Sequence, residues 1–320
     1  MTLEAGQAPA TAAGQTLSTQ VARLYFDRGM TKVEVAAHLG ISRFRVARLL
    51  ENALADGVVR IEFRDALAED RTLATAMEQR FDLDLCAVAT TEDGVARLAG
   101  SILDGLIGPA DVIGVAWGST LAAVVREIAA RPGSSVEVIQ LAGSSARLGR
   151  GQDAGELARV LADRLGGTHR AIYAPAFVER ASLRVALLRE PEVAETVARF
   201  RALDLAIVGI GAMPAVDHAA ASSLLRSGVL DDADVRRLVA AGAIGDLVVH
   251  PFDAAGRFVA PDLAERAIAI GVEDLRHIER VMAIAAGTHK ADAIRGALAT
   301  GIVGMLVTDA STARAALEEA

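Results

Sequence analysis

Three arginines and a phenylalanine gather at the start of one expected helix, in a chain whose net charge is -8. Arg43, Arg45 and Arg48 fall within six positions, and Phe44 lies between the first two. Arginine offers paired donors that suit guanine or phosphate, and an aromatic ring can contact a thymine methyl group. A solvated, charged helix face is the other meaning of such a cluster, so the surrounding elements decide between the two.

The residues around this cluster predict a helix-turn-helix. Apolar residues recur at helical spacing up to Gly29, and Thr31 with Glu34 then forms the capping-box pattern that begins a second helix. Gly40 permits the positive φ that ends this helix, and Ser42 is suited to cap the next one. Only about three residues separate the two helices, which favours a sharp crossing.

In this geometry the third helix reads base edges, and residues beside it hold the DNA backbone. We therefore predict DNA contacts from Lys32, Ser42, Arg43, Phe44, Arg45 and Arg48, with Ser42 and Lys32 placed for phosphates. The stretch VVRIEF after Gly57 alternates apolar and polar residues and predicts a strand, so we expect a winged module. A single recognition helix binds a duplex weakly, which implies at least a homodimer.

The rest of the chain alternates short apolar runs with helical patterns, which predicts a mainly parallel sheet with helices on both faces. Strands are expected at DLCAVAT, DVIGVAW, VEVIQLAG, RAIYAP, LDLAIVGIG, DLVVHPF, RVMAIAAG and GMLVTD. The fold class is therefore α/β: a small N-terminal helix-turn-helix domain followed by a larger, doubly wound sheet domain.

Four loops that follow these strands, WGST, AGSS, GIGA and GTHK, are rich in glycine and small polar residues. Ligands of such sheets bind beyond the carboxyl ends of the strands, where free backbone N–H groups attract anions. Gly118, Ser119 and Thr120 open a helix and would hold a phosphate without any arginine, unless Ser119 is an ordinary helix cap.

Two charged residues accompany these loops. Lys290 lies in the first turn of a helix, where a cation opposes the helix dipole; an anionic ligand would offset this, whereas simple solvent exposure is the alternative. Asp246 begins an apolar strand, where it would accept hydrogen bonds from sugar hydroxyls or serve as a turn acid. A dinucleotide fingerprint, a Walker sequence, a nucleophile elbow and metal-ligand spacing are absent, so we expect no cofactor and no metal.

Length and composition limit the number of domains, the make-up of the core and the cellular location. With 320 residues the chain suits two domains, and aromatic residues at 3% leave a core of small aliphatic side chains. Cys86 is the only cysteine, and neither a signal peptide nor a membrane-length apolar run is present, so we expect a cytoplasmic protein that does not enter a membrane. Up to Arg64 eight basic residues face six acidic ones, a net charge of +2, which leaves -10 on the remainder.

The expected organisation has four parts. These are a disordered tail over residues 1–16, the winged helix-turn-helix over 17–64, a linker or dimerisation helix over 65–81, and an effector-binding and oligomerisation domain over 82–320.

Several segments resemble the SorC family of sugar-binding transcriptional regulators, and the resemblance runs from about Leu17 to the C-terminus. They are MTKVEVAAHLGISRFRVARLL, GVAWGSTL, APAFVE with LLREPEV, LDLAIVGIGA, GAIGDLVVHPFDAAG and AAGTHKADAIRGALATGIVGMLVTDASTA. The resemblance implies a winged helix-turn-helix, an effector domain of the sugar-phosphate isomerase and deaminase type, a phosphorylated sugar or polyol as effector, and a dimer or tetramer.

Site residues carried over from this resemblance fall on the loops described above. Ser119 and Thr120 would take the phosphate, Asp246 a hydroxyl group, and Lys290 an anionic or polar group. The loop with Gly143, Ser144, Ser145 and Arg147 would close over the ligand, and Gly209 and Gly211 would complete the pocket together with Gly118.

Two functions compete with an effector-controlled regulator of a carbohydrate or polyol operon. A sugar-phosphate isomerase or deaminase would use Asp246 with His289 or His250 for proton transfer, but it leaves the DNA-reading module unexplained. A module that contacts only proteins would show no salt-dependent DNA binding.

Overall fold

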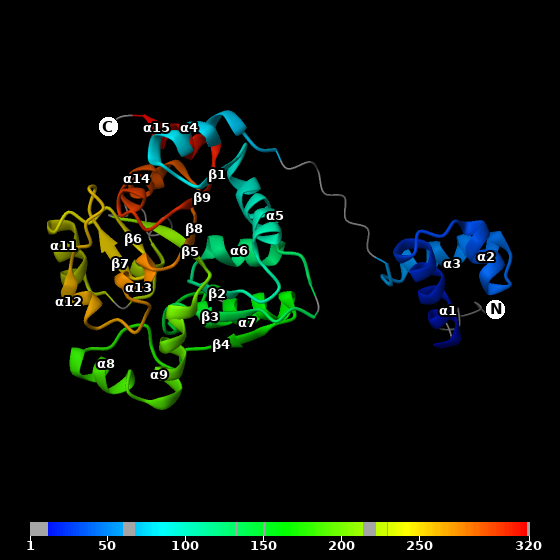
Figure 1. Cartoon of the computed structure of the whole chain (residues 1–320), viewed down its shortest axis with the longest axis horizontal. Coiled ribbons are helices and arrows are strands. Elements are labelled where there is room, and N and C mark those ends of the chain that lie inside the picture. The colour runs from blue at the N-terminus through cyan, green and yellow to red at the C-terminus, as the bar shows by residue number, and fades with distance from the viewer. Residues whose placement is uncertain are drawn as a thin grey trace, which may run out of the picture. The chain divides into compact units, whose positions relative to one another are not determined.

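The computed structural model of the 320-residue chain describes residues 12–59, 68–131, 133–149, 151–213, 222–228 and 230–318. The chain divides into two compact units, residues 1–66 and 67–320, each with its own core. Figure 1 shows a small helical unit at the blue end of the chain and a larger unit built on a sheet. Within the described residues, no helix is long and apolar enough to cross a membrane.

The first unit is a three-helix module. It contains α1 (Ala12–Ala22), a π-helical turn (Arg23–Asp27), α2 (Lys32–Leu39) and α3 (Arg43–Ala55). A small core of Val21, Ala22, Leu24, Val35, Val46, Leu50 and Ala53 joins the helices. Helix α1 begins at Ala12, five residues before the expected start, and residues 12–16 contain no proline that would prevent this extension.

The predicted helix boundaries in this unit follow from local hydrogen bonds. Thr31 and Glu34 form the complete capping box at the start of α2. Gly40 ends that helix at a φ of 63°, and the hydroxyl of Ser42 accepts from the backbone N–H of Arg45 at the start of α3. The expected wing strand falls mainly on residues 60–63, which lie outside the described residues, as do residues 1–11 of the expected tail.

The second unit is built on a nine-stranded sheet, counted over the described residues. Its strands are β1 (Leu85–Ala89), β2 (Val112–Val115), β3 (Glu137–Gln140), β4 (Thr168–Arg170), β5 (Leu205–Ala212), β6 (Gly245–Leu247), β7 (His250–Phe252), β8 (Arg280–Ile284) and β9 (Met305–Asp309). Seven run parallel in the order β1-β9-β8-β5-β2-β3-β4, and the antiparallel hairpin β6–β7 joins β5.

The helices that pack around this sheet follow the alternating pattern expected from the sequence. They are α4 (Arg71–Phe81), α5 (Val95–Leu106), α6 (Ser119–Glu127), α7 (Ala154–Leu165), α8 (Ala181–Leu187), α9 (Pro191–Ala198), α10 (Ser223–Arg226), α11 (Asp232–Ala240), α12 (Pro261–Ala264), α13 (Val272–Arg276), α14 (Ala291–Ala299) and α15 (Ala310–Leu317).

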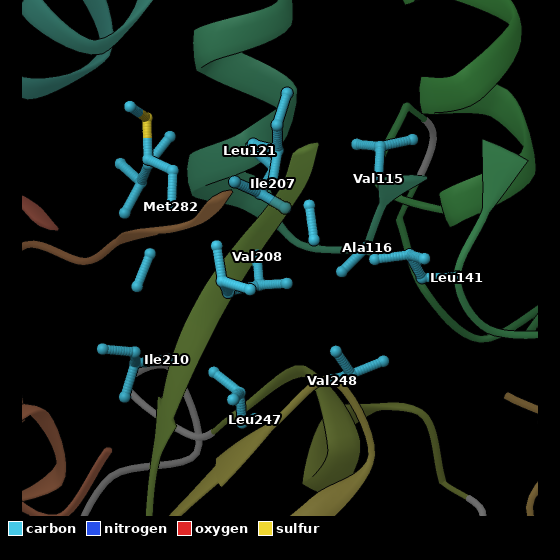
Figure 2. Packing of buried hydrophobic residues seen from close by; sticks show 14 of the residues in the cluster. Val115, Ala116, Leu121, Leu141, Ile207, Val208, Ile210, Leu247, Val248 and Met282 are labelled. Atoms are coloured by element: carbon cyan, nitrogen blue, oxygen red, sulfur yellow. The ribbon is translucent and has the colours of Figure 1, made fainter. Parts of the chain in front are cut away.

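The central strands are covered on both faces. Successive residues of β1, β5, β8 and β9 are almost all buried, and successive side chains of a strand point to opposite faces. Figure 2 shows the apolar side chains along β5, among them Ile207 and Val208, beside Leu141 and Met282 from flanking segments. The α/β, doubly wound fold class is therefore confirmed.

Two of the expected strands are wrong in detail. The stretch RAIYAP leaves the sheet after Arg170, because the Gln140 side chain accepts the backbone N–H of Ile172 at 2.8 Å instead of a neighbouring strand. The stretch DLVVHPF reverses direction between β6 and β7, with Val248 at a φ of 61°. Nothing in the sequence indicates this turn, because a continuous apolar run looks the same whether it forms one strand or two.

The helix expected as a linker or dimerisation element belongs to the second unit. Residues Arg71–Phe81 form α4, which packs on β1 and α15, and Ala74 and Met77 are buried there. Any part of this helix in dimerisation stays a prediction.

Candidate functional site

A cavity of about 220 Å³ lies at the carboxyl ends of β2, β5 and β8. Residues 116–121 after β2 and 209–211 in β5 line it, and the other lining residues are Glu92, Ser222, Ser223, Arg226, Asp246, Val248, Ala286, His289 and Lys290. Strands β2 to β4 extend to one side of the β2–β5 pair, and β8 and β9 extend to the other. The cavity therefore occupies the topological switch point, where open α/β sheets bind ligands.

The start of α6 forms one wall of this cavity. Gly118 caps the helix at a φ of 134°, donates its own N–H to the carbonyl of Gln152, and accepts from Ala122. Among the described residues, nothing accepts a hydrogen bond from the backbone N–H groups of residues 119–121. These free donors and the helix dipole together attract an anion.

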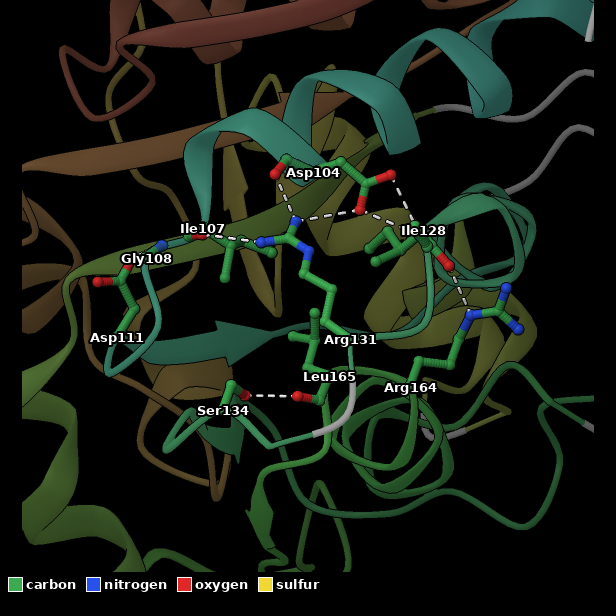
Figure 3. A network of polar contacts seen from close by, with 10 residues as sticks. Asp104, Ile107, Gly108, Asp111, Ile128, Arg131, Ser134, Arg164 and Leu165 are labelled. Atoms are coloured by element: carbon green, nitrogen blue, oxygen red, sulfur yellow. Dashed lines mark hydrogen bonds and ion pairs between the residues drawn. The ribbon is translucent and has the colours of Figure 1, made fainter. Parts of the chain in front are cut away.

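The opposite end of α6 is fixed by a polar network, which Figure 3 shows. Asp104 accepts the N–H of Ala129, Arg131 donates to the carbonyl of Ile107, and Arg164 donates to the carbonyl of Ile128 at 2.8 Å. These bonds tie the segment after α6 to α5 and α7, so the helix presents a fixed N-terminus to the cavity.

Asp246 reaches the cavity from the hairpin, on strand β6. It is 3% exposed and pairs in register with Gly211 of β5. A Cβ atom at Gly211 would lie 2.1 Å from Oδ1 of Asp246, so only glycine leaves room for this carboxyl group. Oδ1 is buried and has no hydrogen-bond partner within the described part of the chain. Burial raises the pKa of Asp246 to about 7, opposed by a hydrogen bond with Ser222 and by the charge of Lys290.

Lys290 enters from the loop after β8. Gly287, at a φ of 99°, begins this loop, and its N–H donates to the buried carboxylate of Asp309 at 2.9 Å. Burial lowers the pKa of Lys290, while the charge of Asp246 acts in the opposite direction. The cavity therefore contains a buried acid, Asp246, and a half-buried base, Lys290, of opposite charge.

Arg226, Ser222 and Ser223 complete the wall, and none of them was expected from the sequence. Nη2 of Arg226 donates to the hydroxyl of Ser223 at 3.1 Å, and Nε is buried without a partner in the described part of the chain. Ser223 and Arg226 belong to α10, and Ser222 caps it; this helix of only four residues is too short to show a periodic pattern in the sequence.

The structure brings together seven of the eleven residues expected to hold the effector. Those that line the cavity are Gly118, Ser119, Thr120, Gly209, Gly211, Asp246 and Lys290. His289 also lines it, whereas His250 does not: its Nε2 lies 2.8 Å from the carbonyl of Ile270, away from this cavity.

The loop with Gly143, Ser144, Ser145 and Arg147 does not line the cavity in this structure, and its expected closure over the ligand stays a prediction. Gly143 packs against the backbone of Ala174 and Pro175, and the hydroxyl of Ser144 donates to Asp153. Ser145 and Arg147 instead contact residues 227–228, directly after α10. The loop thus supports α10 from outside the cavity.

The first unit carries a separate exposed surface. Ser42, Arg43, Phe44, Arg45 and Arg48 are all exposed at the start and on the outer face of α3, and Phe44 is 87% exposed. A groove there is lined by Phe44, Arg45, Arg48, Leu49 and Asn52. Lys32 is exposed at the first position of α2, directly after its N-cap. An exposed large aromatic ring among arginines suits a contact with a nucleic acid better than solvent alone.

Comparison with known proteins identifies the family. Residues 65–318 match the family model described as "Putative sugar-binding domain". The crystal structure of the full-length sorbitol operon regulator SorC from Klebsiella pneumoniae is 26% identical, covers 96% of this chain and 100% of that chain, and superposes with a TM-score of 0.72. This chain belongs to the SorC family of sugar-binding transcriptional regulators.

Other relatives match over nearly the whole length of the chain. The erythritol catabolism regulatory protein EryD of Brucella abortus is 30% identical over 312 residues, which cover 95% of this chain and 96% of that protein. The transcriptional regulator LsrR of an Enterobacter species is 28% identical over 311 residues, which cover 95% of this chain and 93% of that protein.

Proposed function

We propose that this chain is a DNA-binding transcriptional regulator of a carbohydrate or polyol operon, and that a phosphorylated sugar or polyol controls it. The observation that carries the proposal is the cavity at the β2–β5 switch point. Free N–H groups at the start of α6 and the buried carboxylate of Asp246, whose Oδ1 has no partner in the described part of the chain, face the same small space. The first would hold a phosphate, and the second would accept a hydroxyl group.

The volume of the cavity and the names of the relatives support a small, hydroxylated ligand. A cavity of about 220 Å³ lies below the range of roughly 300–1,000 Å³ typical of drug-sized ligands. Relatives are named as regulators of sorbitol and erythritol utilisation and as a deoxyribonucleoside regulator. The common feature of these names is a polyol or sugar unit, which suits a carboxylate that accepts hydroxyl groups.

DNA contact is assigned to the exposed face of α3. Arg43, Arg45 and Arg48 would meet bases and phosphates from the major groove, with Ser42 and Lys32 on the backbone. One such helix binds weakly, so we propose a homodimer or homotetramer, which acts in the cytoplasm where its operator lies. Effector binding would shift the population of two arrangements of this assembly and thereby change DNA affinity.

The competing enzyme hypothesis depends on Asp246, whose pKa of about 7 suits a general base. Of the two histidines that this hypothesis pairs with Asp246, His250 lies outside the cavity and only His289 lines it. Incubation of the full chain with sugar phosphates separates the two functions, because an enzyme would convert them and a regulator would not.

A thermal-shift screen tests the phosphate assignment. The full chain should be stabilised by its phosphorylated sugar or polyol, by about 2.7 kcal/mol at 100 times the dissociation constant, and not by the unphosphorylated form. Thr120→Val should abolish this response and leave DNA binding intact, whereas Thr75→Val on the exposed face of α4 should change neither. An undiminished response of Thr120→Val would place the phosphate elsewhere.

A further inference from the structure

The sheet unit contains a second cavity of about 260 Å³, apart from the cavity at the β2–β5 switch point. Residues of α8, β7, α12 and α13, and of the segment between the last two helices, line it. Among the described residues, none lines both cavities. Most of the second cavity's wall is small and apolar, from Ala264, Ala267, Ala269, Gly271 and Val272. Such a wall suits a small molecule that has a few carbon atoms and few polar groups.

Arg184 of α8 supplies a positive charge to the second cavity. Its Nε donates to the carbonyl of Ala267 at 2.6 Å, which holds the guanidinium at the wall. Within the described residues, no carboxylate forms an ion pair with Arg184. Glu273, which also lines the cavity, forms its ion pair with Arg276. A guanidinium is always charged and presents its other N–H groups as a planar fork, so Arg184 suits a carboxylate.

His250 of β7 supplies a hydrogen-bond acceptor. The residue is 6% exposed, and its Nε2 lies 2.8 Å from the carbonyl of Ile270. A carbonyl oxygen only accepts, so Nε2 carries the hydrogen and donates. Burial lowers the pKa of His250; the bond to Ile270 opposes this, and the charge of Arg184 lowers the pKa further. The ring is therefore neutral at pH 7, and Nδ1, without a partner among the described residues, can accept from a hydroxyl group.

The two polar groups lie within reach of one small ligand. Their partners, Ala267 and Ile270, are three residues apart on one segment, so no more than about 10 Å of chain separates them. The charge of Arg184 also acts on His250, as a short separation requires. A short carbon chain that carries a carboxylate and a hydroxyl group can contact both residues and leave its carbon atoms on the apolar wall.

We propose that the second cavity binds a small hydroxycarboxylate, whose carboxylate contacts Arg184 and whose hydroxyl group donates to Nδ1 of His250. This site goes beyond the proposed function, because it shares no described residue with the cavity assigned to the phosphorylated effector. A phosphate monoester suits it poorly: it carries a charge of about -2, and Arg184 is the one cation among the described lining residues.

Titration of lactate into the full chain, followed by ligand-detected NMR, tests the site. Propionate lacks the hydroxyl group of lactate, and lactamide lacks its charge, so the three probes separate the two contacts. The wild type should bind lactate about tenfold or more tightly than lactamide, and about threefold or more tightly than propionate, as hydrogen bonds to charged and neutral groups contribute. Inorganic phosphate in excess throughout competes with lactate for any anion contact in the first cavity.

Variants assign the contacts to residues. Arg184→Gln should remove the preference for lactate over lactamide, and His250→Phe should remove the preference for lactate over propionate. Arg189→Gln, at an exposed arginine just after α8, should bind all three probes as the wild type does. Ala264→Leu keeps both polar residues and fills the cavity from a half-buried position at the end of α12, so it should lose lactate binding.

Three results would overturn the inference. These are no detectable binding of lactate, equal binding of the three probes by the wild type, and undiminished lactate binding by Ala264→Leu. The last variant decides the matter even if Arg184→Gln or His250→Phe does not fold, which thermal unfolding followed by circular dichroism reveals. None of these results bears on the phosphorylated effector, because its cavity has different walls.

Discussion

Individual residues of the cavity carry charges that burial makes sensitive to pH. Asp246 is the clearest, because its carboxyl group is 3% exposed and one of its oxygens has no partner in the described part of the chain. A protein keeps such a group where a ligand supplies the missing hydrogen bond. The same reasoning applies to Nε of Arg226.

Asp246 should make the unliganded protein less stable as pH rises. Burial raises its pKa from 3.8 to about 7, so between these values the folded chain binds a proton that the unfolded chain has released. The contribution of Asp246 to stability is then largest below about pH 4 and falls as pH rises to about 7, by on the order of 4 kcal/mol at most.

Chemical denaturation of the wild type and of Asp246→Asn at several pH values between 5 and 7 measures this effect. The decline in the free energy of unfolding should be shallower in Asp246→Asn, whereas Glu195→Gln, at an exposed carboxylate of α9, should keep the wild-type slope. Equal slopes in all three proteins would show that Asp246 is ionised at neutral pH.

At the scale of elements, α3 combines a buried face with an exposed arginine face. Val46, Leu50 and Ala53 hold it in the core of the first unit, and Arg45 and Arg48 project outward beside Phe44. A recognition helix needs this division, because its position must be fixed while its outer side chains enter the groove.

Arg45→Ala tests the outer face of α3. The variant should bind operator DNA about 1–3 kcal/mol more weakly and accept more sequences at the contacted position, if Arg45 makes a paired contact with a base. Arg201→Ala, at an exposed arginine of the second unit, is the matched control. Gel-shift titrations at fixed salt give both affinities, and an unchanged affinity and footprint of Arg45→Ala would remove this residue from the reading surface.

Elements were predictable where local chemistry determines them. Thr31 and Glu34 cap α2, Gly40 ends it, and Ser42 caps α3 through contacts within three residues, so the sequence alone reveals them. The apolar runs of the parallel strands are equally plain, because strands covered on both faces must be apolar throughout.

Elements that depend on distant contacts were not predictable. The hairpin β6–β7 reverses at Val248, in a conformation that β-branched residues rarely adopt, and the stretch after β4 leaves the sheet because of Gln140. Nothing in the sequence indicated that Arg226 lines the cavity, since its position there follows from the approach of α10 to Gly118 across the fold. The packing of loop 143–147 against residues 227–228 was not predictable for the same reason.

At the scale of the whole molecule, one chain combines two units with different chemistry. The exposed arginines of the first unit suit a polyanion, and the second unit encloses a small cavity with donors for one anion. The two properties become a regulator only if ligand binding in one unit changes DNA affinity in the other, which is a coupling free energy between sites.

The most direct test is the affinity of the full chain for promoter DNA from its own gene neighbourhood, with and without phosphorylated sugars and polyols. We predict that the wild type binds such a fragment and that one phosphorylated compound changes the dissociation constant about fivefold or more, while its unphosphorylated form has no effect. An identical dissociation constant with every compound, or no binding to any of these fragments, would contradict the account.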